Sequence, residues 1–223
     1  MSSENCICLL TFMRAGEISG DIDTLISSLP FGESERERLH SMKNPAAQKN
    51  SLSALLCLDR LIKRIDISGE DLTIIREKNG KPRFATLPYH FSITHSRDLC
   101  AVALSTENVG LDLEFIDPSR NIEALSKRFF SPEEHSRLFE VNNAVENFFT
   151  LWVKKEAFAK LSGEGLASIC RGQIIDGSQY SFKEYKLSVD GGVARLALCF
   201  EGDAPSIDIN DTRKEIKIYE IQN

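Results

Sequence analysis

Three acidic side chains and a lysine have the types and spacing expected of a magnesium site for phosphate chemistry. Asp112 and Glu114 lie two residues apart within the stretch 110–114, and Glu156 and Lys160 lie four apart in a second block. Side chains two apart in a β-strand share a face, and side chains four apart in a helix do the same. Carboxylate oxygens are the ligands that Mg²⁺ prefers. The spacing therefore predicts a cation held by carboxylates, with a lysine close by.

Hydrophobic patterning predicts the elements that must position these residues. The first pair falls in an expected strand over 109–115, and the second in an expected helix over 143–162 that ends at Gly163. Further helices are expected at 22–29, 33–42, 46–64, 121–128 and 132–140. Further strands are expected at 6–14, 89–94, 99–105, 181–189, 193–200 and 215–221, with a hairpin turn at 190–192.

These elements predict an α+β fold, and the similar ingredients of its two halves hint at a pseudo-twofold duplication. Each half is expected to be a small, mostly antiparallel sheet packed with helices. The 223 residues and 42% hydrophobic content are enough for a packed core. We expect the division near residue 105, with residues 1–105 as an N-terminal half and 106–223 as a C-terminal half that contains the metal and catalytic residues.

Charge and cysteine usage exclude several functional classes. The net charge is −6, and residues 106–223 carry the whole acidic excess, with 14 basic and 20 acidic side chains. An acidic chain without a basic run is a poor nucleic-acid binder. No stretch of eighteen apolar residues and no signal-peptide pattern occurs, which favours a soluble cytoplasmic protein that does not bind membranes. The six scattered cysteines are expected to be buried thiols.

Four blocks of sequence, in this order, resemble the signature of 4'-phosphopantetheinyl transferases of the Sfp type. The blocks are Gly80-Lys81-Pro82 with Phe91-Ser92-Ile93-Thr94-His95-Ser96, then Gly110-Leu111-Asp112-Leu113-Glu114, then Arg128-Phe129-Phe130-Ser131-Pro132-Glu133-Glu134, then Trp152-Val153-Lys154-Lys155-Glu156-Ala157-Phe158-Ala159-Lys160. One such block is a weak signal, whereas four in order are specific. The resemblance spans roughly residues 45–170.

The resemblance implies an enzyme that moves the phosphopantetheine arm of coenzyme A to a serine of an apo acyl or peptidyl carrier protein. Adenosine 3',5'-bisphosphate would be released. The implied metal ligands are Asp112, Glu114 and Glu156, holding Mg²⁺ or, in its place, Mn²⁺. A chain with two fused halves is expected to act as a monomer.

The implied catalytic residues are Glu134, Glu156 and Lys160. Glu134 matches the glutamate that activates the attacking serine, directly or through water. Lys160 is a cation near a carboxylate cluster, and such a group keeps its proton. It is therefore the better electrostatic stabiliser, and Glu134 the better base.

The implied coenzyme A contacts lie in the N-terminal half. Lys81 and His95 match phosphate-contacting positions, Thr94 stands where relatives usually have serine, and Lys49 stands where they tend to have arginine. The segment 34–38 lacks the lysines that relatives often carry near the 3'-phosphate. Arg36 or Arg38 is the expected substitute.

Taken one at a time, these residues have structural alternatives. Asp112 and Glu114 fit an ordinary exposed strand, and Glu156 with Lys160 fits a helical ion pair. Ser131-Pro132-Glu133-Glu134 fits a capping box in which Glu134 bonds back to the Ser131 amide.

Two other functions remain open at the level of sequence. A metal-dependent phosphohydrolase or nuclease also uses carboxylates and a lysine, but usually on one strand two residues apart. A degenerate paralogue would bind coenzyme A or a carrier protein without turnover. Sequence motifs of serine hydrolases, P-loop nucleotide triphosphatases and Rossmann enzymes are absent.

Overall fold

The computed structural model describes residues 7–67, 71–140, 142–165, 179–209 and 216–221. The chain divides into two compact units. Unit 1 consists of Met1–Val109 with Pro205–Asp211, and unit 2 of Gly110–Ala204 with Thr212–Asn223. Each unit is described by itself below.

Unit 1 is built on a four-stranded sheet in the order β4-β5-β1-β9. Its strands are β4 (His90–Ser96), β5 (Leu99–Ser105), β1 (Ile7–Arg14) and β9 (Ser206–Ile209). β1 and β4 both pair antiparallel with β5, whereas β9 joins β1 in parallel. Every residue of β5 is buried, which is typical of a strand covered on both faces. A short hairpin of β2 (Ile74–Arg76) and β3 (Pro82–Phe84) forms a separate two-stranded sheet.

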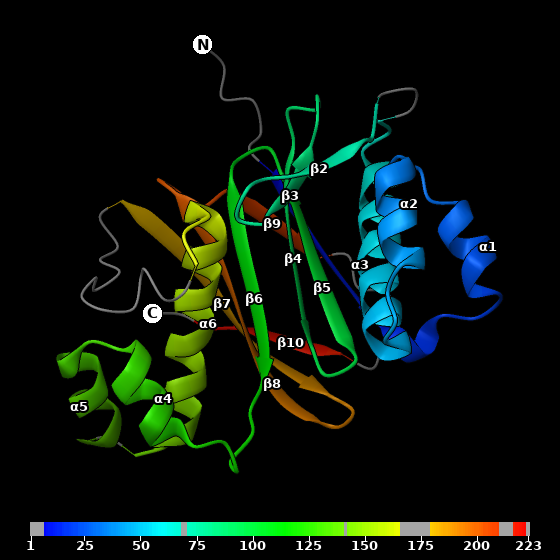
Figure 1. Ribbon diagram of the computed structural model, residues 1–223. Coiled ribbons are helices and arrows are strands. Elements are labelled where there is room, and N and C mark those ends of the chain that lie inside the picture. The colour runs from blue at the N-terminus through cyan, green and yellow to red at the C-terminus, as the bar shows by residue number, and fades with distance from the viewer. Residues whose placement is uncertain (1–6, 68–70, 141, 166–178, 210–215, 222–223) are drawn as a thin grey trace. The chain divides into compact units, whose positions relative to one another are not determined.

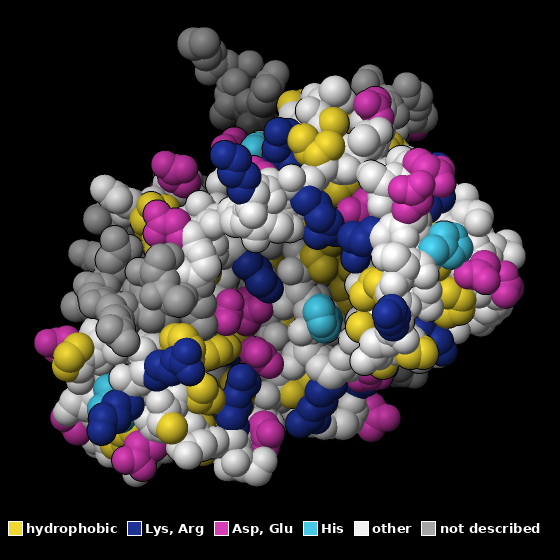
Figure 2. All heavy atoms as spheres, in the orientation of Figure 1, with side chains coloured by type: hydrophobic (Ala, Val, Ile, Leu, Met, Phe, Trp, Pro, Cys, Tyr) yellow, Lys and Arg dark blue, Asp and Glu magenta, His cyan; other side chains and the backbone are white. Residues whose placement is uncertain are grey.

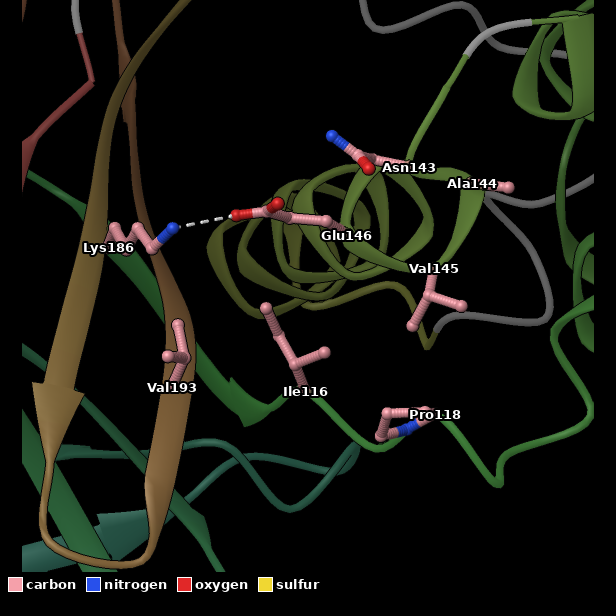
Figure 3. Close-up of a pocket in the computed structure, with 8 residues that line it drawn as sticks. All are labelled: Ile116, Pro118, Asn143, Ala144, Val145, Glu146, Lys186 and Val193. Atoms are coloured by element: carbon pink, nitrogen blue, oxygen red, sulfur yellow. Dashed lines mark hydrogen bonds and ion pairs between the residues drawn. The ribbon is translucent and has the colours of Figure 1, made fainter.

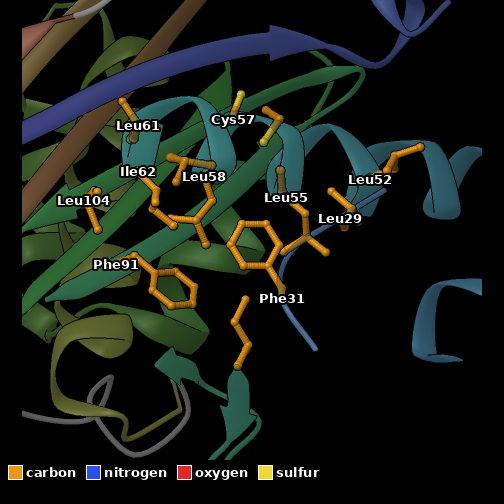
Figure 4. Close-up of a cluster of buried hydrophobic side chains, with 14 of the residues drawn as sticks. Leu29, Phe31, Leu52, Leu55, Cys57, Leu58, Leu61, Ile62, Phe91 and Leu104 are labelled. Carbon is orange, nitrogen blue, oxygen red and sulfur yellow. The ribbon is translucent and has the colours of Figure 1, made fainter. Parts of the chain in front are cut away.

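The helices of unit 1 are α1 (Ile22–Ser27), α2 (Glu33–His40) and α3 (Pro45–Arg64), preceded by a 3-10 turn, η1 (Ala15–Glu17). α3 starts sharply because Asn44 accepts hydrogen bonds from the Ala46 and Ala47 amides and proline occupies the first helical position. Its apolar face packs on β1 and β5. Figure 4 shows this core, in which the helix side chains meet Phe31 and Phe91.

Unit 2 repeats the same ingredients with a second four-stranded sheet, in the order β10-β7-β8-β6. Its strands are β10 (Lys217–Glu220), β7 (Tyr180–Val189), β8 (Gly192–Glu201) and β6 (Val109–Phe115). The helices are α4 (Ile122–Phe129), α5 (Pro132–Glu140) and α6 (Ala144–Ser162) (Figure 1). α6 packs on β8 through a buried cluster that includes Val153, Ala157 and Ala197. An aromatic cluster of Phe130, Phe148, Phe149 and Trp152 joins α6 to the segment around α4 and α5.

The structure confirms the predicted α+β class and most of the predicted elements. The strands expected at 99–105 and 109–115 have those bounds, and α6 ends at Gly163, whose φ of 75° is left-handed. The β2–β3 hairpin and β9 were not predicted. Each of these strands has only three or four residues, too few for alternation to show.

Cys8, Cys57, Cys100 and Cys199 are buried, as expected, while Cys6 and Cys170 lie outside the described residues. Within the described ranges, no helix combines the length and apolar character needed to cross a membrane.

Candidate active site

A glycine allows the strand and the helix that carry the predicted metal ligands to approach closely. A Cβ atom added to Gly110 on β6 would lie 1.9 Å from the backbone oxygen of Ala157 and 2.7 Å from the backbone nitrogen of Leu161 on α6. Any side chain there would force strand and helix apart. The glycine at the start of the Gly-Leu-Asp-Leu-Glu block therefore brings α6 against β6.

This close approach brings Lys160 to Asp112. The Lys160 ammonium lies 2.8 Å from Oδ1 of Asp112 and donates a second hydrogen bond, of 2.9 Å, to the backbone oxygen of Leu111. The Asp112 side chain is only 8% exposed, whereas that of Lys160 is 31% exposed. The two blocks that the sequence separates by more than forty residues therefore meet in a charge-assisted bond.

Glu156 and Glu114 lie in the same electrostatic environment. Burial and the negative charge of Asp112 raise the pKa of Glu156 to about 6, with a further contribution from Glu114. Lys160 and Arg120 oppose the rise. Arg120 also lies 3.7 Å from Oε1 of Glu114. Asp112 and Glu114 both act on the charge of Glu156, and we refer to the three as the carboxylate cluster of unit 2.

The cluster suits a hard divalent cation in its chemistry. It offers three carboxylates, which are the oxygen ligands that such a cation prefers. The carboxylates are not gathered into a ready coordination shell, since no group of three acidic, histidine or cysteine side chains in the described part of the chain has metal-binding proximity. The charge of Asp112 is paired with the ammonium of Lys160. The role of Asp112, Glu114 and Glu156 as Mg²⁺ ligands stays a prediction.

Glu134 makes the capping box that was the alternative to a catalytic role. Its amide donates to Oγ of Ser131 at 3.1 Å, and its Oε2 accepts from the Ser131 amide at 2.8 Å, at the start of α5. The same Oε2 lies 2.9 Å from the ammonium of Lys155, whose side chain is 1% exposed and which also lies 5.6 Å from the Phe130 ring centroid. Capping is thus present, and the role of Glu134 as a base stays a prediction.

The predicted coenzyme contacts in unit 1 differ in accessibility. His95 and Lys49 are exposed, on β4 and near the start of α3. Thr94 is 3% exposed and, as the neighbour of His95 on a strand, points to the opposite face. Lys81 is half-buried and donates to Oδ1 of Asn108 at 3.1 Å, and burial lowers the pKa of its ammonium, with Glu77 opposing. The structure therefore leaves His95, Lys49 and Lys81 more accessible than Thr94.

Arg36 and Arg38 lie on α2 with different partners. The guanidinium of Arg36 binds the exposed carboxylate of Glu33 and the backbone oxygen of Leu29. Nε of Arg38 donates at 2.8 Å to Glu35, whose side chain is 4% exposed. Either arginine was an expected substitute for the missing lysines, and only Arg38 is anchored on a buried carboxylate.

Sequence reasoning gave no role to Arg120, Lys155 or Gly110. The position of Lys155 directly before Glu156 in a strongly helical block predicts only that the two point in different directions. The signal for Gly110 was available, because an isolated glycine within a strand pattern indicates a close backbone approach. No spacing rule connects Arg120 to Glu114 and Trp152, although its guanidinium lies 5.3 Å from the Trp152 ring centroid.

A cavity of about 550 Å³ lies apart from the predicted site residues in unit 2. It is lined mainly by apolar side chains and by the ion pair of Glu146 with Lys186, as Figure 3 shows. None of its lining residues was predicted to act. On the face shown in Figure 2, acidic and basic side chains are interspersed.

Comparisons with known proteins point to one family. Residues 108–202, which include β6 and all of α4 to α6, match the family model of the 4'-phosphopantetheinyl transferase superfamily. The chain is 37% identical over 100 residues to the 4'-phosphopantetheinyl transferase HetI of Nostoc sp., covering 42% of each chain. It is 29% identical over 172 residues to gsp of Aneurinibacillus migulanus, covering 76% of this chain and 71% of gsp. It is also 29% identical over 154 residues to Sfp of Bacillus subtilis, covering 62% and 68%. The match thus spans only about two fifths of the length of HetI.

Proposed function

We propose that this chain, which belongs to the 4'-phosphopantetheinyl transferase superfamily, transfers the 4'-phosphopantetheine arm of coenzyme A to a serine of an apo carrier protein. The ion pair between Lys160 and Asp112, whose charges both act on Glu156, is the observation that supports the proposal most. It connects the sequence block 110–114 with the block 152–160. We propose that the enzyme is cytoplasmic and monomeric and that it acts on acyl or peptidyl carriers.

The reaction would break one bond of the coenzyme A pyrophosphate. The serine Oγ attacks the phosphorus that bears the pantetheine arm, and adenosine 3',5'-bisphosphate leaves with the bridging oxygen. Charge grows on the phosphate oxygens during this displacement. Mg²⁺ or Mn²⁺ held by Asp112, Glu114 and Glu156 would neutralise part of that charge.

The basic groups near the carboxylates would stabilise the same charge. Lys160 presents its ammonium at Asp112 with 31% of its side chain exposed, so it is available to a phosphate oxygen. Arg120 lies close to Glu114, and its guanidinium is oriented by the Trp152 ring. Both cations are therefore held in place before a substrate binds.

Glu134 is the proposed acceptor of the serine proton. The Ser131 amide and the Lys155 ammonium both bind its Oε2, which fixes the orientation of the carboxylate on the first turn of α5. A fixed carboxylate is a better general base than a mobile one, because its position relative to the hydroxyl is set in advance. We propose that Lys81, His95, Lys49 and, on a buried face, Thr94 complete the contacts to coenzyme A.

The proposal is tested by incubating the protein with coenzyme A, Mg²⁺ and a panel of apo acyl and peptidyl carriers. We expect the mass of at least one carrier to rise by one phosphopantetheine group, and chelation of Mg²⁺ with EDTA to prevent the rise. A folded protein that binds coenzyme A but modifies no carrier in the panel would instead support the non-catalytic paralogue. Release of phosphate from simple esters would support the phosphohydrolase.

A further inference from the structure

The cavity of about 550 Å³ in unit 2 combines an apolar wall with a charged end (Figure 3). The charged end is the ion pair of Glu146 on α6 with Lys186 on β7. The wall is formed by four apolar side chains from the end of β6, the first turn of α6 and the start of β8: Ile116, Pro118, Val145 and Val193. All of the lining residues belong to unit 2, and none is a member of its carboxylate cluster. A concave, mostly apolar site with a few polar groups is typical of small-molecule binding.

The apolar wall is fixed from behind by the aromatic core of unit 2. Ile116 and Val145 are half-buried and pack against the cluster that contains Phe148 and Phe149. Val193 on β8 is half-buried as well. Apolar surface that stays partly exposed on a concave wall is covered favourably by a ligand with an apolar body.

Glu146 binds two cations, and only one of them is readily accessible. Its Oε1 accepts a hydrogen bond from Nζ of Lys186 at 3.1 Å and another from Nη2 of Arg195. Lys186 and Arg195 lie opposite each other in the β7–β8 ladder, so their side chains share the sheet face that meets α6. The side chain of Arg195 is 11% exposed, and that of Lys186 is 42% exposed. The buried arginine therefore holds the carboxylate in place, and the exposed lysine borders the cavity.

The triad of Glu146, Lys186 and Arg195 has an excess of positive charge. The hydrogen bond from Lys186 and the charges of both cations lower the pKa of the Glu146 carboxyl, against the effect of burial, so it is ionised at neutral pH. Two positive charges thus accompany one negative charge. An ammonium has three donors, and within the described ranges that of Lys186 makes a hydrogen bond only to Glu146. A ligand with a single negative charge would neutralise the triad and accept from a second donor of Lys186.

The start of α6 acts in the same direction. Asn143, at the cap position, lines the cavity and makes no side-chain hydrogen bond to the first turn. The first amides of a helix have no acceptor within the helix and give this end a partial positive charge. Glu146 lies in the same turn, but its charge is already paired with two cations. The effect of the helix is smaller than that of Lys186 and adds to the preference for an anion.

We propose that this cavity binds a small aliphatic monocarboxylate, with the carboxylate on Lys186 and the hydrocarbon chain against the apolar wall. An ammonium of the same shape would meet an excess of positive charge. A polyanion would leave most of its charge against apolar side chains, which is unfavourable. The cavity is separate from the carboxylate cluster, so the inference does not rest on the proposed transferase function.

The test compares three ligands with the same eight-carbon chain, octanoate, octanamide and octylammonium, by isothermal titration calorimetry on the full chain. We expect octanoate to bind at one site with a dissociation constant of about 1 mM. Octanamide, which has no charge, should bind about tenfold more weakly, and octylammonium more weakly still. Acetate, which has no chain, should give no measurable binding.

Lys186→Gln should weaken octanoate binding about tenfold. Lys183→Gln is the matched control, because Lys183 lies on the same strand, has a similar exposed fraction of 38% and pairs with Glu220. Its affinity for octanoate should equal that of the wild type. A second measurement needs no variant: in NMR spectra of the wild type, octanoate should shift the amide signals of Ala144 and Val145.

Several results would overturn the inference. Equal binding of octanoate and octanamide would mean that the charged end has no role, and tighter binding of octylammonium would assign that end to Glu146. The absence of octanoate binding up to about 10 mM, or the same affinity in the Lys186→Gln and Lys183→Gln variants, would also contradict it. Amide shifts confined to residues outside the cavity would place the ligand elsewhere. The outcome of the carrier assay leaves this inference unchanged.

Discussion

The carboxylate cluster of unit 2 and the Glu35 cluster of unit 1 (Glu35 with Arg38 and Arg76) have opposite excess charge. In unit 2, Asp112, Glu114 and Glu156 outnumber the cations Lys160 and Arg120. In unit 1, Arg38 and Arg76 outnumber the single carboxylate of Glu35. In unit 2 the cations Lys160 and Arg120 pair with Asp112 and Glu114. In unit 1 the carboxylate of Glu35 pairs with both arginines. An incompletely compensated site is suited to a ligand of the opposite sign, so the first suits a cation and the second an anion.

Among the variants, Asp112→Asn is expected to change the activity most. Removal of one carboxylate weakens cation binding and releases Lys160, so carrier modification should fall roughly a hundredfold or more. Rates of carrier mass shift measure this loss, and circular dichroism checks that the variant is folded. Full activity would remove Asp112 from the cation site.

Glu134→Gln should destabilise the protein by about 3 kcal/mol, because it leaves Lys155 charged, 1% exposed and without its carboxylate. Urea unfolding measures this loss. The double variant Glu134→Gln with Lys155→Met removes both charges and should recover most of the stability but not the rate. Lys155→Met alone keeps the carboxylate and serves as the control. Recovery of the rate in the double variant would show that Glu134 acts only as a cap.

Gly110→Ala tests whether the cluster of unit 2 depends on close contact between β6 and α6. The added methyl group would overlap the backbone of α6, and we expect a loss of about 2–3 kcal/mol in the free energy of unfolding. Gly165→Ala is the control, since nothing lies within 4 Å of its Cβ position. Equal stability of the two variants would contradict the close approach.

Glu35→Gln should cost about 1–2 kcal/mol, because two half-exposed guanidinium groups lose their shared charge partner. Glu33→Gln is the matched change on the same helix, and its exposed pair with Arg36 should contribute less than about 0.5 kcal/mol. Thermal unfolding in moderate salt distinguishes them. A similar small loss in both would mean that burial adds nothing to the Glu35 cluster.

The smallest effect is a dependence of stability on pH. The pKa of Glu156 is about 6 in the folded state and higher than its ordinary value of 4.5, so the folded protein holds this proton more tightly. The resulting stability is present below about pH 4.5 and is lost as pH rises through about 6. Melting of the EDTA-treated protein should show this fall, and Glu156→Gln should flatten it.

Mg²⁺ gives the matching control, because a cation favours the ionised carboxylate. Added Mg²⁺ should raise the melting temperature at pH 7 in the wild type and much less in Glu156→Gln. The same increase in both proteins would place the cation elsewhere.

Long, strongly patterned elements could be predicted from the sequence alone. The apolar stripe of α3 and the Gly163 end of α6 are local signals, because capping and amphipathic periodicity act within a few residues. Three- and four-residue strands such as β9 carry no such signal. β9 exists because β1 offers it an edge, and that edge is formed by a segment nearly two hundred residues earlier.

The candidate site, too, could be predicted only in part from the sequence. The same-face spacing of Asp112 with Glu114 and of Glu156 with Lys160 is a property of strand and helix geometry, so the sequence predicts each pair. The sequence is compatible with Glu134 as a helix cap and as a general base. The structure shows the capping bonds.

The sequence by itself determined the resemblance to a family, the α+β class and the types of charge available, because these depend on composition, periodicity and ordered motifs. Only the tertiary structure decided which charges meet. Lys160 reaches Asp112 because Gly110 lets two backbones pack closely, and Arg76 reaches Glu35 across 41 residues because a hairpin places it beside α2. Ion pairs form where folding brings side chains within a few ångströms, and no spacing in the chain encodes that distance.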